Sequence, residues 1–299
     1  MIFAIETSCD ETSTSIIDLE GKILSHIIKK QEDHKNYGGV VPELASRAHL
    51  QILQKIIPES YKEAGVKRGS ISAFCATCGP GLIGGLIIGS TIAKSMAIIN
   101  NKPFYPINHL EGHALSVQIN NKVSFPYILL LITGGHTQIY IVKKINKYKL
   151  LGTTIDDSVG EAFDKVAKML GMPYPGGLYV ENNALSGKID SIKLPRPLIN
   201  SKDLNFSFSG LKTAVKIQMN KKNIISKTFI NNLCASFQQA VIDILITKTQ
   251  KAINYSKERK FGVKNIVIAG GVAANKSINK SFYLLGKINN IKFIAPPIE

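Results

Sequence analysis

The feature of this sequence that most constrains its fold is a strand pattern that occurs twice, about half a chain apart. In each copy an apolar strand leads through a short polar turn into a second and a third strand. The predicted strands are residues 2–5, 13–18 and 23–28 in the first copy, and 128–133, 138–142 and 148–151 in the second. Short apolar runs bounded by polar or glycine-rich turns are typical of β-strands. Two copies of one design predict a duplicated, two-lobed α/β protein.

Helical and strand patterns also fill the chain between and after the two copies. The predicted helices are 42–64, a segment ending at 99, 158–170, 231–255 and a segment after Asn275, and the further strands are 72–76, 104–107 and 264–269. Residues 178–205 have the least regular pattern and are expected to form an insertion or loop. Because no long linker interrupts the chain, we divide it into an N-terminal lobe, 1–108, and a C-terminal lobe, 109–299, that carries a helical insertion.

Composition limits the function classes. The 299 residues include only four cysteines, which excludes a disulfide scaffold. The most apolar stretch, Gly81–Ile99, is interrupted by glycines, serines and Lys94, so we expect no membrane span and a cytoplasmic protein. The formal net charge of +16 suggests an anionic partner such as nucleic acid. Lysine makes up 33 of the 37 basic residues, which suits phosphate attraction better than base-specific readout.

A pair of histidines stands out at His109 and His113. Four residues on a helix turn through about 400°, so the two rings face the same side, within about 40°. This spacing favours a metal site, although two ordinary surface or core histidines would share it. Glu111 points to the other side of such a helix and does not give the His-Glu-x-x-His order of zinc proteases.

Three glycine-rich turns each follow a predicted strand. They are Gly79–Gly85, Thr133–Thr137 and Gly270–Asn275. Glycines at a strand end allow main-chain amides to approach an anion, a carbonyl or an adenosine. The alternatives are a close helix–strand packing for the first turn, a hairpin turn for the second and an ordinary strand–helix connection for the third. None has the Gly-Lys-Ser/Thr ending of a P-loop.

Three weaker motifs have both a functional and a structural interpretation. Glu161 and Asp164 share one face of a predicted helix, which suits ribose hydroxyls, a cation or plain solvation. Residues 206–212 alternate aromatic and hydroxyl side chains and are compatible with an edge strand. Cys75 and Cys78 have a redox or metal spacing, but without a second pair we interpret them as small core residues.

In this order, the motifs resemble those of the TsaD family, the tRNA N6-adenosine threonylcarbamoyltransferases. The resemblance covers residues 2 to about 297. Its segments are Ile5–Thr12, Tyr37–Arg47, Gly79–Leu82, His109–His113, Gly134–Thr137, Gly160–Lys165, Tyr174–Gly177, Phe206–Lys212 and Gly270–Asn275.

The resemblance implies an actin-like ATPase fold of the ASKHA type, with two lobes around a nucleotide cleft. It implies transfer of a threonylcarbamoyl group from threonylcarbamoyl-AMP to N6 of the adenosine 3′ of the anticodon, in tRNAs that read codons starting with A (t6A formation), with release of AMP. One divalent metal, iron or zinc, would be bound by His109 and His113. A TsaB-like paralogue and a TsaE-like ATPase would be the partners.

The resemblance also implies the donor-binding residues, with no catalytic side chain beyond the metal site. The main chain and side chains expected to contact the acyl-adenylate are Leu131, Ile132, Thr133, Gly134 and Gly135. Those expected to hold its ribose and adenine are Asp164, Gly177 and Asn275, with a weaker correspondence at Glu181.

One departure from the family pattern raises an alternative. The family carries a further segment after the region of Pro296 and Pro297, with an Asp that is the third protein ligand of the metal, whereas this sequence stops at Glu299. Either the sequence is a fragment of a longer chain, or it is a natural truncation in which we expect weakened metal binding. The alternatives are a non-catalytic scaffold that binds nucleotide and tRNA, or an acetate- or sugar-kinase-like phosphotransferase, which would leave the histidine pair unexplained.

Overall fold

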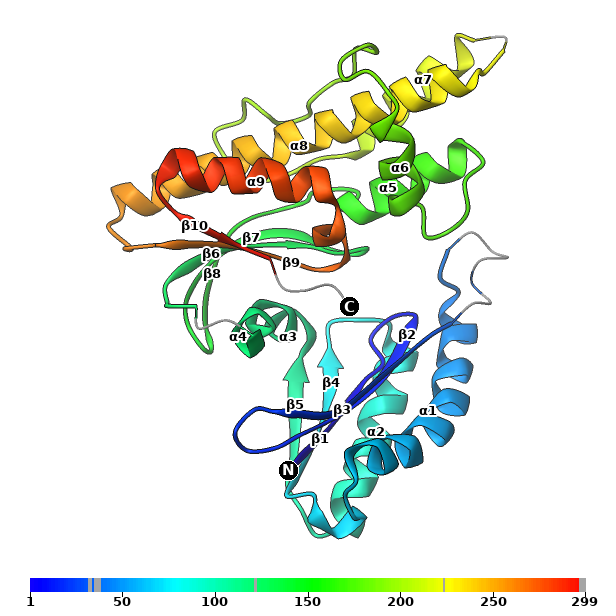
Figure 1. Ribbon diagram of the computed structural model, residues 1–299, viewed down its shortest axis with the longest axis vertical. Helices are drawn as coiled ribbons and strands as arrows, with labels where there is room; N and C mark the ends of the chain where they lie inside the picture. Colours follow the sequence, from blue (N-terminus) through cyan, green and yellow to red (C-terminus); the bar gives the residue numbers. More distant parts are fainter. Residues whose placement is uncertain (32–33, 35–38, 121–122, 223, 296–299) are drawn as a thin grey trace. The chain divides into compact units, whose positions relative to one another are not determined.

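The computed structural model describes residues 1–31, 34, 39–120, 123–222 and 224–295 (Figure 1). The chain forms two compact units, Met1–Gly112 and His113–Glu299. The lobe boundary expected from the sequence, between 108 and 109, stays a prediction. Residues 37 and 38 of the Tyr37–Arg47 motif and the residues from Pro296 to Glu299 lie outside the described residues.

A five-stranded mixed sheet forms the centre of the first unit, in the order β3-β2-β1-β4-β5. Its strands are β1 (Ile2–Glu6), β2 (Glu11–Ile17), β3 (Ile23–Lys30), β4 (Ala73–Gly79) and β5 (Phe104–Asn108). β1 pairs antiparallel with β2 (Ile2 opposite Ile17) and parallel with β4 (Ile2 opposite Ala73). Phe3 and Ile5 of β1 are buried and their neighbours are less so, because successive side chains of a strand point to opposite faces of the sheet.

Two helices pack against this sheet and against each other, α1 (Pro42–Ala64) and α2 (Ile83–Ile99) (Figure 1). α1 has proline in its first turn and ends at Gly65, whose φ of 64° is the left-handed cap that favours glycine. The buried face of α2 consists of small residues, Gly85, Gly89, Ala93 and Ala97. A short 3-10 helix, η2 (Arg68–Ser70), precedes β4.

The glycines of the first turn serve this packing. A Cβ at Gly81 would lie 2.7 Å from the Ser8 carbonyl oxygen, and one at Gly85 would overlap the carbonyl of Thr7. Glycine is therefore needed where α2 approaches the loop after β1. This favours the packing interpretation of Gly79–Gly85 over a phosphate loop.

The second unit repeats the topology of the first. Its sheet has the order β10-β9-β6-β7-β8. The strands are β6 (Tyr127–Ile132), β7 (Thr137–Lys144), β8 (Lys147–Thr153), β9 (Asn265–Ala269) and β10 (Lys292–Ile294). β6 pairs antiparallel with β7 and parallel with β9, as β1 does with β2 and β4. The predicted duplication is confirmed.

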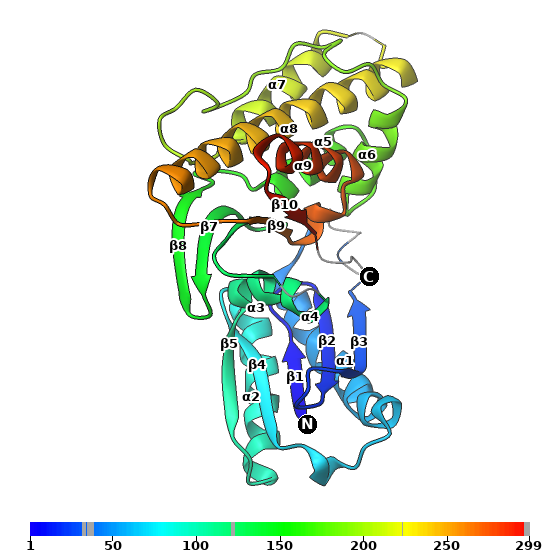
Figure 2. The same ribbon diagram turned by 60° about the vertical axis from the view of Figure 1, so that its left-hand side comes forward.

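Helices inserted between β8 and β9 cover the second sheet (Figure 2). The helices of the described chain from α3 onward are α3 (His109–Leu115), α4 (Val117–Asn120), α5 (Val159–Met169), α6 (Gly177–Leu185), α7 (Ser209–Asn220), α8 (Lys227–Glu258), the 3-10 helix η3 (Gly271–Ala274) and α9 (Lys276–Asn289). Within the described residues, only α8 is long and apolar enough to cross a membrane, with a mean hydropathy of 1.3 in its most apolar window. Because 61% of that window is buried inside the protein, α8 is accounted for as a core helix.

Three sequence predictions need correction. Residues 178–185, placed in the irregular segment, belong to α6 (Gly177–Leu185), because Val180, Glu181 and Ala184 turn one face into the unit. Residues 206–212 are no edge strand: Phe206 makes one isolated bridge with Thr154, and α7 begins at Ser209. Cys78 is exposed and Cys75 is half-buried, so neither cysteine is a fully buried core residue.

Candidate functional site

The two histidines predicted to bind a metal lie on α3, which begins directly after β5. Asn108, the last residue of the strand, starts the helix: its Oδ1 accepts hydrogen bonds from the amides of Leu110 (2.9 Å) and Glu111 (3.2 Å). His109 and His113 are therefore four residues apart on one helix, as expected.

A half-buried carboxylate, which the sequence did not single out, contacts the His109 ring. Glu6 Oε2 lies 3.5 Å from His109 Nδ1, and Ser8 Oγ lies 3.2 Å from the same nitrogen. The Ser8 amide donates to Glu6 Oε1 at 2.6 Å, and the Thr77 hydroxyl donates to Oε2. Burial raises the pKa of Glu6, but hydrogen bonds from His109, Ser8 and Thr77 lower it more, to about 2. Glu6 is therefore ionised at neutral pH.

The arrangement fits a metal-binding histidine. Such histidines commonly donate their second ring N–H to a carboxylate, which fixes the tautomer and the ring orientation. Here Nδ1 is engaged by Glu6 and Ser8, so Nε2 of His109 is the nitrogen suited to a metal. Across the described residues, no group of three His, Cys, Asp or Glu side chains is arranged to hold a metal ion.

His49 shows the contrasting, structural use of a histidine. Its ring is fully buried, with Nδ1 2.8 Å from Thr12 Oγ1 and Nε2 3.0 Å from the Cys9 carbonyl oxygen. Burial lowers its pKa, which favours the neutral ring. His49 therefore ties α1 to the loop after β1.

In the second unit, the turn after β6 is held by a threonine. Thr133 Oγ1 accepts hydrogen bonds from the amides of Gly135 (3.2 Å) and His136 (2.9 Å), and the Thr133 amide donates to the His136 carbonyl (2.8 Å). Leu131 and Ile132, at the end of β6, have fully buried side chains, which are therefore not available to a ligand. The Gly135 amide is directed to Thr133, which leaves Gly134 as the amide of the predicted glycine pair without such a bond.

The N-terminus of α5 packs onto this turn. Ser158 caps the helix by accepting from the Glu161 amide (3.2 Å), and its hydroxyl donates to the Gly134 carbonyl (2.5 Å). Gly160 permits the approach, because a Cβ there would lie 2.7 Å from the Thr133 carbonyl oxygen. The turn and the helix are thus one rigid piece.

The third glycine turn meets the end of the same strand. Gly270 has a φ of 100°, and a Cβ there would lie 2.5 Å from the Ile132 carbonyl oxygen. Asn275 follows and caps α9: its Oδ1 accepts from the Ile278 amide (3.0 Å), while its Nδ2 donates to Gln238 Oε1 (2.7 Å). The Asn275 side chain is buried and engaged on both sides.

Two acidic side chains join the remaining predicted positions to these turns. Asp164 of α5 accepts a hydrogen bond from the Gly176 amide (2.7 Å), directly before Gly177. Glu181 of α6 accepts from the Lys276 amide (2.8 Å), directly after Asn275. The structure therefore links Asp164, Gly177 and Asn275 through α6 within the second unit.

A second carboxylate missed in the sequence is Asp156. Its Oδ1 accepts from the amides of Phe208 (2.8 Å) and Ser209 (3.3 Å), and its Oδ2 accepts from the hydroxyls of Ser207 (2.5 Å) and Ser209 (2.8 Å). It ties the motif 206–212 to the start of α5. The sequence shows an acidic residue before a predicted helix and hydroxyl residues far along the chain, but nothing in it indicates that these residues contact each other.

Comparison with known proteins then decides the family. Residues 22–299 match the family model described as "TsaD: tRNA N6-adenosine threonylcarbamoyltransferase". The chain belongs to the TsaD family. A Brucella suis protein named tRNA N6-adenosine threonylcarbamoyltransferase is 47% identical over 305 residues, which cover 100% of this chain and 85% of that protein. A Brucella abortus protein of the same name is 46% identical over the same shares.

Solved structures agree on the fold of this TsaD family member. HypF from T. kodakarensis superposes with a TM-score of 0.64 at 12% identity, covering 100% of this chain and 45% of that one. Component A of (R)-2-hydroxyglutaryl-CoA dehydratase from Acidaminococcus fermentans gives 0.54 at 15% identity, covering 99% and 92%. At such identities the likeness shows the fold alone. The fold is the actin-like ATPase fold, as predicted.

Proposed function

We propose that this chain transfers a threonylcarbamoyl group to N6 of the adenosine 3′ of the anticodon in tRNAs that read codons starting with A. The family match over residues 22–299 carries this conclusion. The glycine turns and the histidine pair on α3 are consistent with this proposal. The enzyme is therefore a transferase that modifies tRNA.

The donor in this proposal is threonylcarbamoyl-AMP. Its acyl-phosphate end would lie at the turn formed by Leu131, Ile132, Thr133, Gly134 and Gly135, and its ribose and adenine would lie at Asp164, Gly177 and Asn275. The hydrogen-bonded chain from Asp164 through α6 to Lys276 supports this grouping. Because Leu131 and Ile132 are buried and Asn275 caps α9, these three positions would contribute main chain and shape.

The proposed reaction is an acyl transfer to an amine. A bond forms between N6 of adenosine and the carbamoyl carbon, the bond from that carbon to the phosphate oxygen of AMP breaks, and N6 loses one proton. AMP is a good leaving group, so the reaction needs no Ser or Cys nucleophile on the enzyme. Main-chain N–H donors near the reacting carbonyl stabilise the negative charge that develops on its oxygen. The Gly134 amide is our candidate donor.

We also propose that one divalent metal, iron or zinc, binds to His109 and His113. A bound divalent metal supplies Lewis-acid polarisation of a carbonyl or phosphate oxygen. The role of this chain's residues is to hold the rings: Glu6 and Ser8 fix His109, and Asn108 starts the helix that carries both histidines. A cytoplasmic location and cooperation with a TsaB-like paralogue and a TsaE-like ATPase complete the proposal.

Nucleoside mass spectrometry tests the function. Unmodified tRNA is incubated with the protein, the two partner proteins and the donor, with the Brucella suis relative as a positive control. We expect threonylcarbamoyladenosine from the wild type and none from His109→Ala. His26→Ala, an exposed histidine on β3, is the matched control and is expected to remain active. Wild-type protein that binds tRNA and nucleotide without forming the product would instead support a scaffold.

A further inference from the structure

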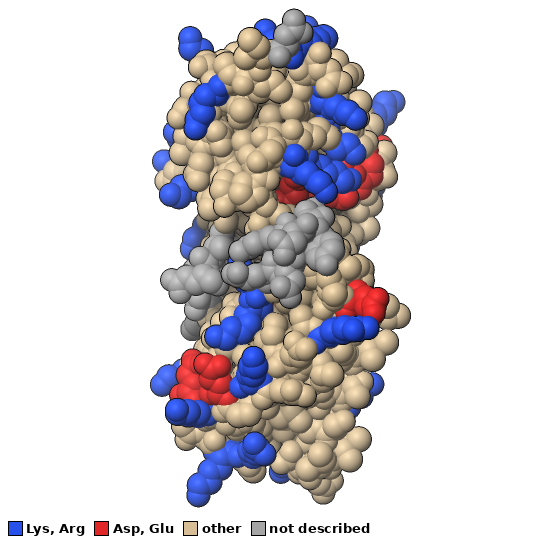
Figure 3. Space-filling model, turned by 90° about the vertical axis from the view of Figure 1, so that its right-hand side faces the viewer, with Lys and Arg blue, Asp and Glu red and all other residues tan. Residues whose placement is uncertain are grey.

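A hollow lined by lysines lies between α5 and α7 in the second unit. It has a volume of about 600 Å³ and is lined by Lys165, Lys168, Met169, Lys212, Thr213 and Lys216. Figure 3 looks onto the side of the second unit where α5, α6 and α7 lie, and it shows basic side chains gathered beside acidic ones. We call the hollow lined by Lys165, Lys168, Lys212 and Lys216 the lysine hollow. None of them belongs to the donor or metal positions proposed above.

Acidic neighbours pair with two of these four lysines, Lys165 and Lys212. Asp157 lies 2.7 Å from Lys165 Nζ and 3.2 Å from Lys212 Nζ, and Glu161 lies 2.7 Å from Lys165 Nζ. Hydrogen bonds to Asp157 and Glu161 raise the pKa of Lys165, which keeps it charged. Two acids thus face four lysines.

The other two lysines, Lys168 and Lys216, are exposed. Within the part of the chain that the structure describes, neither of these lysines has an ion pair. Lys168 follows Lys165 by three residues on α5, and Lys216 follows Lys212 by four on α7, so each helix presents its lysines as a row on one face. The rows flank the same hollow from two sides.

We propose that the lysine hollow binds phosphates of the tRNA backbone; this rests on the proposed function and adds a surface to it. Lysine is a point charge that suits phosphate, and neutralised phosphates release counterions that favour binding. The lining contains no aromatic side chain and no arginine, so base stacking and bidentate base readout are not expected. Lys165 directly follows Asp164 on α5, so one helix carries residues of both the lysine hollow and the proposed donor site.

The test is the salt dependence of tRNA binding, measured with and without the partner proteins. If Lys168 and Lys216 each contact a phosphate, K168Q/K216Q reduces the magnitude of the negative slope of log K against log[salt] by about 1.4 to 1.8 and weakens binding roughly tenfold or more near ~0.15 M salt. K168R/K216R should restore the slope, because it keeps both charges. Thermal unfolding shows whether each variant is folded.

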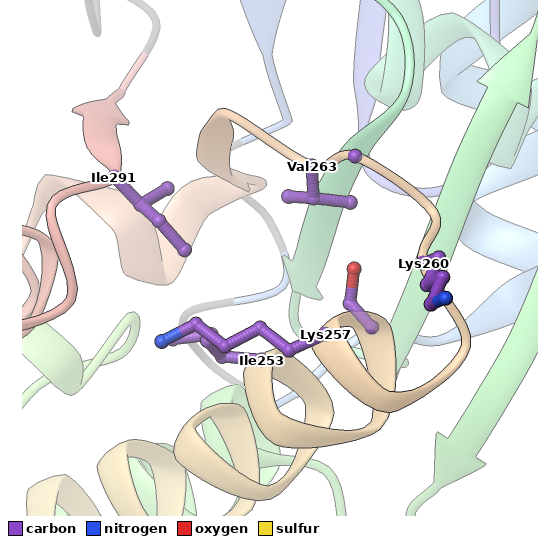
Figure 4. Close-up of a pocket in the computed structure, with 7 residues that line it drawn as sticks. Ile253, Lys257, Lys260, Val263 and Ile291 are labelled. Carbon is purple, nitrogen blue, oxygen red and sulfur yellow. The ribbon is translucent and has the colours of Figure 1, made fainter.

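A second hollow in the same unit provides the matched control. It lies at the end of α8 and is lined in part by the exposed Lys257 and Lys260 (Figure 4). K257Q/K260Q removes the same net charge from the same unit, so a long-range effect of charge alone would change both double variants equally. We expect the control to bind tRNA with a nearly unchanged slope.

Several results would overturn the proposal. They are equal slopes for the two double variants, an unchanged slope for K168Q/K216Q, or saturable binding of inorganic phosphate at the hollow without any effect on tRNA. If the wild type forms threonylcarbamoyladenosine while K168Q/K216Q binds tRNA normally, the lysine hollow fails and the proposed function stands. If the wild type neither binds nor modifies tRNA while the Brucella suis relative does, the proposed function fails.

Discussion

The carboxylate of Asp156 offers the sharpest stability prediction, because it makes four hydrogen bonds to one short segment. Two come from main-chain amides at the start of α7 and two from the Ser207 and Ser209 hydroxyls. An ionised carboxylate is also favoured at a helix N-terminus by the helix dipole. Asp156→Ala removes all of these interactions and leaves several donors to water.

The expected magnitude follows from the bonds. Each hydrogen bond contributes about 0.5–1.5 kcal/mol net, and Asp156 is exposed, so the lower end applies. Asp156→Ala should therefore lower the free energy of unfolding by about 2–4 kcal/mol. Asp156→Asn keeps an oxygen for the two amides and an NH2 group that the serine hydroxyls can accept, so it should cost about 1 kcal/mol.

The pH dependence distinguishes this account from simple loss of packing. Burial raises the pKa of Asp156, but the hydrogen bonds from Ser207, Phe208 and Ser209 lower it more, so its folded pKa lies below the ordinary aspartate value of 3.8. A lowered carboxyl pKa contributes stability above 3.8 that is lost as the pH falls through the folded pKa. The stability gap between the wild type and Asp156→Asn should therefore begin to narrow as the pH falls below about 3.8 and close as the pH falls through the lower folded pKa.

Hydrogen exchange of the α7 amides and urea unfolding followed by circular dichroism measure these effects. Asp18→Asn is the control, because Asp18 accepts hydrogen bonds from two amides of its own turn in the first unit. A gap between wild type and Asp156→Asn that is as large at pH 3 as at pH 7 would refute the reasoning. So would a loss below ~0.5 kcal/mol for Asp156→Ala.

Three further variants test the site. Glu6→Gln should lower the affinity for zinc, measured by titration, by about 10- to 100-fold while the protein stays folded, because a neutral amide holds the α3 histidine less well; unchanged affinity would contradict the positioning role. Gly270→Ala should lower the free energy of unfolding by about 2–4 kcal/mol, measured by thermal unfolding, because the φ of Gly270 is 100° and an added Cβ would meet the Ile132 carbonyl. Gly271→Ala is its control and should be close to neutral, because a Cβ there meets nothing within 4 Å. Asn275→Ala should cost about 1–2 kcal/mol through the lost cap of α9, and a melting temperature equal to that of the wild type would exclude this role.

The sequence allowed the topology to be predicted because each strand is short, apolar and bounded by a polar turn. The repeated strand order then left little freedom, and both sheets have the predicted first three strands adjacent. The helix carrying His109 and His113 was equally predictable, since it follows a strand directly. Local patterns of this kind are visible within a window of about ten residues.

Contacts between distant segments were not predictable in this way. Asp156 and Ser207 are 51 positions apart, and Glu6 and Thr77 are 71 positions apart. Each residue alone looks like an ordinary polar loop residue, and only the folded chain brings the partners together. α6 was missed for a related reason: its apolar face is short and interrupted by two asparagines, and its packing against α8 stabilises it.

The glycines of the motifs separate into two groups once the structure is known, and this gives a last test. At Gly81, Gly160 and Gly270, the space that a Cβ would take is already occupied by main-chain atoms of the protein, so the role of these glycines is packing. A Cβ at Gly134 or Gly177, in contrast, would meet no atom within 4 Å, and neither residue has a positive φ.

Gly134→Ala and Gly177→Ala should therefore leave thermal stability within about 0.5 kcal/mol of the wild type. If these two glycines exist to let the acyl-adenylate approach the main chain, the added methyl groups should weaken binding of AMP or of a non-hydrolysable donor analogue by about tenfold or more. Gly112→Ala is the control, because its Cβ also meets nothing within 4 Å and no donor role is proposed for it. Variants that are stable and bind the analogue as the wild type does would show that open space at these glycines has no part in holding the donor.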